Sequence, residues 1–421
     1  MVFAKKSTNS SKIPHDSEAS KLKTQVAMKR NKNLDKLKSG YLFPEIQKRK
    51  KEFLAKHPDA KLISLGIGDT TEPVSEQVAQ AMAQLSTRLG TAHGYIGYGS
   101  EQGIEPLRKK IAESFYKNRI SPDEIFISDG AKCDLGRLQV LFGGDIRVAI
   151  QDPAYPVYID GSQVQGIDHI HPMKCTPENG FFPDLKTMPP CDLIYFCSPN
   201  NPTGAVCTRK QLEELVAFAK KHHSIILFDA AYSSYIRTPD LPRSIYEIEG
   251  AKEVAIEINS FSKLAGFTGI RLGWTVVPES LKYENGASVR SDWNRITTTL
   301  FNGASIIAQH GGMAALEDEN NEKMIQFYLE NARLIKKALE EMGYQVFGGV
   351  DAPYLWVHFP GKKSWDVFQH LLEKAHIVTT PGSGFGPEGE GFLRLTAYGK
   401  REPILEAIER LKKFLDRYVI N

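Results

Sequence analysis

Between about residue 95 and residue 310, short apolar runs alternate with longer segments of helical periodicity. Six of the apolar runs have the length of buried strands. They are residues 124–128, 147–150, 192–196, 224–228, 254–258 and 273–277. Among the helical segments, residues 209–222 place Leu212, Leu215, Val216 and Phe218 on one side. This alternation predicts an α/β fold with a mostly parallel sheet covered by helices.

The pattern changes after residue 315. An amphipathic segment at residues 322–342 ends before Gly343, and its apolar positions predict one long helix. Strands are predicted at residues 354–359 and 392–396, and a last helix at 404–418. These elements predict a smaller α+β domain. The expected division is a disordered extension (1–30), an N-terminal arm with part of the small domain (31–75), a large domain (76–314) and the small domain (315–421).

Length, charge and composition narrow the class of protein. The chain has 421 residues, enough for two domains, and no apolar run approaches the length of a membrane span. The formal net charge of +3 is too small to indicate a nucleic-acid partner. Residues 1–26 are polar and rich in Ser and Lys, which predicts disorder. They have neither the apolar core of a secretory signal nor the Arg-rich character of a transit peptide, so we expect a cytoplasmic protein, with a plastid as the alternative.

The five cysteines form no C-x-x-C pair, and the eleven histidines show no H-E-x-x-H spacing. An odd number of unpaired cysteines predicts reduced thiols rather than a disulfide framework. We therefore expect no metal site and no structural disulfide.

The most informative segment spans residues 260–273. Lys263 lies beside the hydroxyls of Ser260 and Ser262, and Arg271 follows in a glycine-rich stretch. A lysine amine forms a Schiff base with an aldehyde, and hydroxyls with a guanidinium hold a phosphate. The segment therefore predicts a lysine that bonds a phosphorylated aldehyde. The alternative is a solvated lysine in a Gly/Ser loop.

Residues 260–273 resemble the pyridoxal-phosphate attachment motif of the class I/II aminotransferases, and further motifs agree in order and spacing over residues 41–400. The resemblance implies fold type I, in which a large domain with a seven-stranded, mostly parallel sheet joins a smaller α+β domain. It also implies pyridoxal 5'-phosphate as cofactor and a homodimer whose active sites are shared across the interface.

Polar residues at predicted strand ends extend the motif. Asp229 directly follows the strand predicted at 224–228. A buried carboxylate at such a strand end is a good partner for a pyridinium nitrogen. The alternative is that it caps the N-terminus of a helix. Asn201 lies in the turn Asn-Pro-Thr-Gly, and Tyr232 follows Asp229 by three residues. The resemblance implies that Asn201 and Tyr232 hydrogen-bond the phenolic oxygen of the cofactor.

The sequence also predicts where a phosphate binds. Ala131 and Lys132 follow Gly130 at the expected start of a helix, and a helix N-terminus attracts anions. By the resemblance, Ser260, Ser262 and Arg271 converge at the same phosphate. The resemblance further implies that Tyr98 reaches the phosphate from the partner subunit, that Tyr155 stacks on the ring, and that Arg394 binds the substrate α-carboxylate.

At three places the sequence departs from the general pattern of the family and resembles the branch that acts on LL-diaminopimelate. These places are residues 41–45, Glu101 after the Tyr98 loop, and Lys132. This branch exchanges amino groups between glutamate/2-oxoglutarate and tetrahydrodipicolinate/LL-2,6-diaminopimelate in the biosynthesis of lysine and peptidoglycan precursors. We expect Lys132 to bind the distal carboxylate and Glu101 the distal ammonium. The alternatives are that Glu101 lies at a helix N-terminus, where the dipole favours it, and that Lys132 only supports the phosphate. The resemblance adds Tyr41, Gly68 and Asn302 to the substrate or cofactor shell. Tyr155 and Asn201 are also expected to contact substrate.

The expected catalytic residues are Lys263, which moves the proton, Asp229, which keeps the ring nitrogen protonated, and Tyr232. An aminotransferase for aspartate or aromatic amino acids, or a lyase with the same cofactor, is the alternative. A regulator that senses the cofactor would carry a DNA-binding domain, which a polar tail of about 30 residues cannot form.

Overall fold

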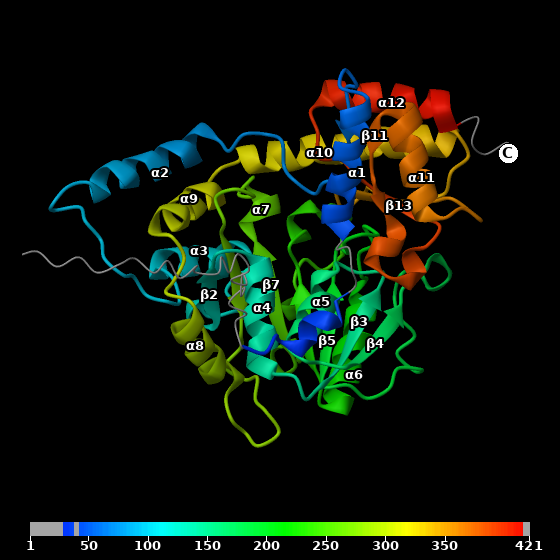
Figure 1. Ribbon diagram of the computed structural model, residues 1–421. Coiled ribbons are helices and arrows are strands. Elements are labelled where there is room, and N and C mark those ends of the chain that lie inside the picture. Colours follow the sequence, from blue (N-terminus) through cyan, green and yellow to red (C-terminus); the bar gives the residue numbers. More distant parts are fainter. Residues whose placement is uncertain (1–27, 38–41, 416–421) are drawn as a thin grey trace, which may run out of the picture.

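The computed structural model describes residues 28–37 and 42–415 of the chain. A seven-stranded sheet lies at its centre (Figure 1), in the order β2-β8-β7-β6-β5-β3-β4. Its strands are β2 (Ile125–Ser128), β3 (Arg147–Asp152), β4 (His169–Lys174), β5 (Leu193–Cys197), β6 (Ile225–Asp229), β7 (Ala255–Ser260) and β8 (Gly273–Val276). Only β8 is antiparallel to its neighbours, β2 and β7. The predicted α/β class and mostly parallel sheet are confirmed.

Both faces of this sheet are buried, which explains the continuous apolar runs in the sequence. In β5, Ile194 and Phe196 pack with α2 (Glu76–Leu89), α3 (Glu105–Ser114), α6 (Arg209–His222) and α9 (Ile306–Leu316). On the other face, Leu193 and Tyr195 pack with α4 (Ala131–Phe142), α5 (Val157–Val164) and α8 (Val289–Leu300). The sheet is therefore a rigid layer between two hydrophobic cores.

The edge strand β4 was not predicted. Five of its six residues are exposed or only partly buried, and it contains Pro172, which has no backbone N–H. An edge strand tolerates both features because one side of its backbone has no partner strand. An apolar run is therefore missing where the strand lies.

A second, antiparallel sheet has the order β12-β13-β10-β9 and lies at the upper right of Figure 1. It consists of β9 (Val346–Gly348), β10 (Tyr354–His358), β12 (Thr380–Pro381) and β13 (Phe392–Thr396). The helices of this part are α1 (Leu42–Lys56), α10 (Asn320–Glu341), α11 (Ser364–His370) and α12 (Arg401–Leu415). A short parallel pair, β1 (Ile63–Ser64) with β11 (Ile377–Val378), brings the N-terminal part of the chain against it.

The predicted long helix is α10, within two residues at either end, and the predicted last helix begins three residues earlier, at Arg401. Its expected end at residue 418 and the expected disordered extension, apart from its last three residues, lie outside the described residues. The domain boundaries stay a prediction. Over residues 28–37 and 42–415, no helix is long and apolar enough to cross a membrane.

Candidate active site

The carboxyl ends of β5, β6 and β7 open onto a cavity of about 550 Å³. In parallel strands these ends meet at one edge of the sheet, where ligands bind in such folds. Twelve of the residues predicted for the site line it: Gly68, Ala131, Lys132, Tyr155, Asn201, Asp229, Tyr232, Ser260, Ser262, Lys263, Arg271 and Arg394. Residues separated by more than 300 positions in the sequence thus meet around one cavity.

Lys263 enters the cavity from a short helix that begins where β7 ends. The hydroxyl of Ser260 accepts a hydrogen bond from the Ser262 N–H, 3.0 Å away, and so caps α7 (Phe261–Leu264). The Lys263 Nζ donates to the carbonyl oxygen of Gly68. Burial lowers the pKa of Lys263 to about 8, assisted by Arg394 and Arg271 and opposed by Asp69. An amine with this pKa is about half unprotonated near pH 8, so it can act as a nucleophile or base.

Asp229 is the last residue of β6 and its side chain is buried. One carboxylate oxygen accepts a hydrogen bond of 2.7 Å from the Tyr158 hydroxyl, and the other accepts one of 3.0 Å from the Ala231 N–H. Burial raises the pKa of Asp229. The next helical turn begins at Ser233 and is preceded by Tyr232, so Asp229 is not its cap. A buried carboxylate with two neutral donors favours a cationic partner in the cavity.

An anion site lies at the other end of the cavity. Arg271 donates to the Ser262 hydroxyl (3.3 Å) and to the Thr268 carbonyl (3.0 Å). A Cβ at Gly130 would lie 2.3 Å from the Arg271 Nη2, so glycine allows the guanidinium to approach the start of α4. Hydroxyls, a guanidinium and a helix N-terminus together suit a phosphate.

Arg394 is a buried cation on β13, only 1% exposed. Its guanidinium donates to the Asn201 side-chain oxygen (2.7 Å) and to the Gly66 carbonyl (2.5 Å). Its Nε has no hydrogen-bond partner among the described residues. Since no carboxylate pairs with it there, Arg394 is suited to bind the carboxylate of a ligand.

Two tyrosines of the site were missed from the sequence. Tyr158 holds Asp229, and Tyr354, at the start of β10, has its hydroxyl 2.7 Å from that of Tyr232. Both line the cavity. Each lies in an apolar segment, Tyr158 in α5 and Tyr354 in β10, where the sequence pattern does not distinguish a core tyrosine from a functional one. Only the packing of α5 and β10 around the cavity in the folded chain reveals their contacts.

Three predicted site residues, Tyr98, Glu101 and Asn302, do not line the cavity, and Tyr41 lies outside the described residues. Tyr98 is 91% exposed on the segment between α2 and α3, which runs along the outer edge of the molecule (Figure 1). A Cβ at Gly303 would lie 3.5 Å from the Cα of Glu101, so Asn302 lies close to this segment. Helix α3 begins only at Glu105, and Glu101 therefore does not form its first turn.

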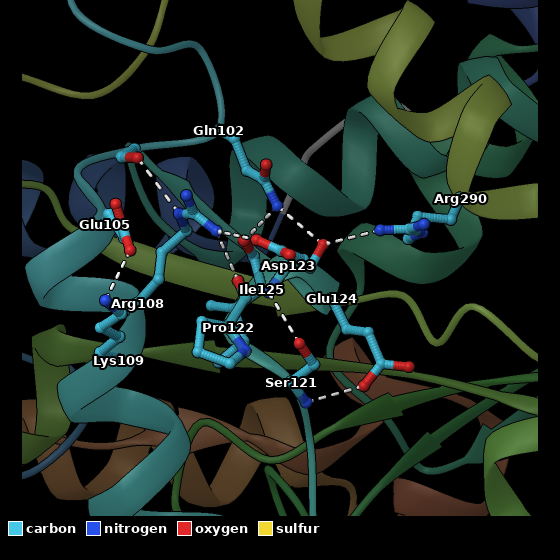
Figure 2. Close-up of polar contacts among 11 residues, drawn as sticks. Gln102, Glu105, Arg108, Lys109, Ser121, Pro122, Asp123, Glu124, Ile125 and Arg290 are labelled. Atoms are coloured by element: carbon cyan, nitrogen blue, oxygen red, sulfur yellow. Dashed lines mark hydrogen bonds and ion pairs between the residues drawn. The ribbon is translucent and has the colours of Figure 1, made fainter. Parts of the chain in front are cut away.

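The segment that begins with the partly buried Glu101 is held to the sheet by the next residue, Gln102. Figure 2 shows the Gln102 amide, which donates to the carbonyl oxygens of Asp123 and Ile125, both at 2.9 Å. The Asp123 carbonyl also accepts from Arg290. The two bonds of Gln102 thus tie the residue next to Glu101 to the start of β2.

Comparisons with known proteins agree with this geometry. The family described as aminotransferase class I and II matches residues 60–411. The LL-diaminopimelate aminotransferase of Protochlamydia amoebophila is 55% identical over 402 residues, covering 92% of this chain and 98% of that protein. The chloroplastic LL-diaminopimelate aminotransferase of Arabidopsis thaliana is also 55% identical, covering 93% of this chain and 88% of that protein.

A solved structure agrees as well. The L,L-diaminopimelate aminotransferase from Chlamydomonas reinhardtii is 57% identical, with a TM-score of 0.89, and the match covers 92% of this chain and 99% of that one. Identity and fold thus extend over nearly the whole chain, including every strand that contributes to the cavity. The chain therefore belongs to the class I and II aminotransferase family, in the branch of the LL-diaminopimelate aminotransferases.

Proposed function

We propose that the protein is a pyridoxal-phosphate-dependent aminotransferase that exchanges amino groups between glutamate/2-oxoglutarate and tetrahydrodipicolinate/LL-2,6-diaminopimelate, in the biosynthesis of lysine and peptidoglycan precursors. One observation carries the proposal: Lys263, Asp229 and the anion site with Arg271 line the same cavity. The similarity to LL-diaminopimelate aminotransferases supports the choice of substrate. We place the protein in the cytoplasm, with a plastid as the alternative.

The residues of the cavity fit the cofactor. Ser260, Ser262, Arg271 and the N-terminus of α4, at Ala131 and Lys132, would hold its phosphate, and Asp229 its ring nitrogen. Tyr155 would cover the ring, while Asn201 and Tyr232 would bind its phenolic oxygen. The amine of the substrate would displace Lys263 from pyridoxal phosphate, which would then supply an electron-withdrawing group for the substrate α-carbon and leave the lysine amine free. The Lys263 Nζ takes the proton from that carbon and later returns one, as general base and acid.

Opposite ends of the substrate would be bound by residues of two subunits. Arg394 binds the α-carboxylate and Lys132 the distal carboxylate of either substrate. The distal ammonium of diaminopimelate, which glutamate lacks, is bound by Glu101 of a second copy of the chain. Tyr41, Gly68 and Asn302 complete this shell, and Tyr98 reaches the phosphate. Tyr95 and Tyr98 are 74% and 91% exposed on the same segment, and two exposed aromatic side chains close together favour an interaction surface, which supports a homodimer with shared sites.

The proposed function can be tested by the absorbance of the bound cofactor. The purified protein with pyridoxal phosphate is mixed separately with LL-diaminopimelate, meso-diaminopimelate, glutamate, aspartate and lysine. We expect LL-diaminopimelate and glutamate alone to convert the cofactor to its pyridoxamine form. Conversion by aspartate or aromatic amino acids instead would support the alternative aminotransferase, and no absorbance band would refute the role of Lys263.

Replacing Glu101 with Gln is expected to lower kcat/KM for LL-diaminopimelate about 10- to 100-fold, because the partner of a distal ammonium is lost. The value for glutamate should change less than about threefold. Glu105→Gln is the matched control, because Glu105 lies on α3 nearby and its only ion pair within the described part of the chain is with Lys109, 2.6 Å away. Equal losses for both substrates would contradict the proposed role of Glu101.

Capture of the cofactor should depend on pH through Lys263. The unprotonated amine reacts, and its pKa of about 8 means that this form increases between pH 7 and 9. We expect the rate at which cofactor-free protein binds pyridoxal phosphate to rise through a midpoint near pH 8, as followed by absorbance in a stopped-flow instrument. A rate that still rises steeply above pH 10 would mean that the lysine keeps its ordinary pKa.

A further inference from the structure

We propose that Tyr354 is a positioning residue of the reaction. Its hydroxyl orients Tyr232 toward the cofactor, and its ring supports the arginine that binds the carboxylate. The inference rests on the proposed function and deepens it. Tyr354 lines the cavity and is 1% exposed, and it begins strand β10.

The first contact is with Tyr232. The two hydroxyl oxygens are 2.7 Å apart, and the Tyr232 hydroxyl has no other hydrogen-bond partner among the described residues. A hydroxyl has a single proton to donate. When Tyr354 donates its proton to the Tyr232 oxygen, the proton of Tyr232 is free to point into the cavity. The Tyr232 hydroxyl then accepts one hydrogen bond while it donates another, which makes it a stronger donor. Tyr354 therefore sets both the direction and the strength of the Tyr232 donor.

The second contact is with Arg394. Its guanidinium carbon lies 4.5 Å from the centroid of the Tyr354 ring, within the range of a cation–π interaction. The register of the sheet places them together, because Tyr354 pairs with Thr396, two residues beyond Arg394 on β13. The ring, rather than the hydroxyl, supports the arginine.

The third contact is with Gly68. A Cβ on this residue would lie 2.4 Å from the Tyr354 hydroxyl oxygen, but 3.5 Å from the ring carbon that bears it. The hydroxyl alone therefore excludes a side chain at residue 68. The Gly68 carbonyl accepts a hydrogen bond from the Lys263 amine. By its contact with Gly68, Tyr354 therefore also restricts the position of this carbonyl. One tyrosine thus touches three parts of the site, which are otherwise supplied by the segment after β6, by β13 and by the segment after β1.

Two substitutions of Tyr354 distinguish the effect of its hydroxyl from the effect of its ring. Tyr354→Phe should lower kcat about 3- to 10-fold, the effect of losing one hydrogen bond, with KM nearly unchanged. The pH midpoint of the bound cofactor's absorbance should rise, because a weaker Tyr232 donor stabilises the phenolate less. Tyr354→Leu should in addition raise KM. Tyr235→Phe is the control, because this buried tyrosine belongs to the same tyrosine cluster but does not line the cavity.

A double variant tests the contact with Gly68. Gly68→Ala alone should weaken cofactor binding, and adding Tyr354→Phe should restore part of it, because the obstructing oxygen is gone. The inference is overturned if Tyr354→Phe leaves kcat and the absorbance midpoint at the values of the Tyr235→Phe control, or if the double variant shows no recovery. Failure of the proposed function would look different, because the unmodified protein would then show no cofactor band.

Discussion

Replacing Lys263 with alanine is expected to abolish transamination, lowering kcat by about 10⁴-fold or more. The substitution removes both the amine that bonds the cofactor and the base that moves the proton. No other amine in the cavity replaces it, because Lys132, the second lysine that lines it, lies at the start of α4 beside the anion site. Single-turnover absorbance measurements with LL-diaminopimelate and glutamate give the result directly.

Two further variants distinguish the roles of Lys263. Lys263→Arg keeps the positive charge but, with a guanidinium pKa above about 12, supplies neither nucleophile nor base, so it should be as inactive as alanine. Lys210→Ala, an exposed lysine on α6, is the matched control and should keep full activity. Activity of Lys263→Ala above about one per cent of the unmodified protein would refute the assigned chemistry.

The sequence predicts this part of the site well for a physical reason. Ser260, Ser262, Lys263 and Arg271 lie within twelve consecutive residues, and their relative positions are fixed by a strand end, a helical turn and a glycine-rich loop. Similarly, the strand that precedes Asn201 and the strand that ends at Asp229 are buried on both faces, so the sequence shows them as uninterrupted apolar runs. Local constraints of this kind are visible without knowledge of the fold.

Other parts depend on contacts between distant segments. Tyr354 meets Tyr232 across 122 positions and Tyr158 meets Asp229 across 71, and neither pair leaves a local signal. The edge strand β4 is missed because its exposed positions remove the apolar run. Tyr98, Glu101 and Asn302 are a different case, since the described chain places them outside the cavity and their part in the site rests on the proposed dimer.

The second large effect is expected at Asp229. Replacing it with Asn should lower kcat about 10²- to 10³-fold, because the carboxylate that stabilises a protonated ring nitrogen is lost while the shape of the side chain is kept. Tyr158→Phe is the matched control, since it removes the 2.7 Å hydrogen bond to the same carboxylate but leaves its charge. We expect a loss of less than about tenfold there. Similar losses in both variants would show that hydrogen bonding, and not charge, is what the cofactor requires.

Asp229→Asn should also change the thermal stability of the protein, in one direction without the cofactor and in the other direction for the increase that the cofactor produces. In the cofactor-free protein the Asp229 carboxylate is buried without a cation among its partners, and its pKa is raised. A carboxyl group whose pKa is higher in the folded than in the unfolded state loses stability as the pH rises through that interval, so near neutral pH the charge destabilises the fold. Asp229→Asn should therefore raise the melting temperature of the cofactor-free protein and reduce the further increase that pyridoxal phosphate produces. An unchanged increase would mean that Asp229 does not face the ring nitrogen, because only a cationic partner converts this buried charge from a cost into a contribution to binding.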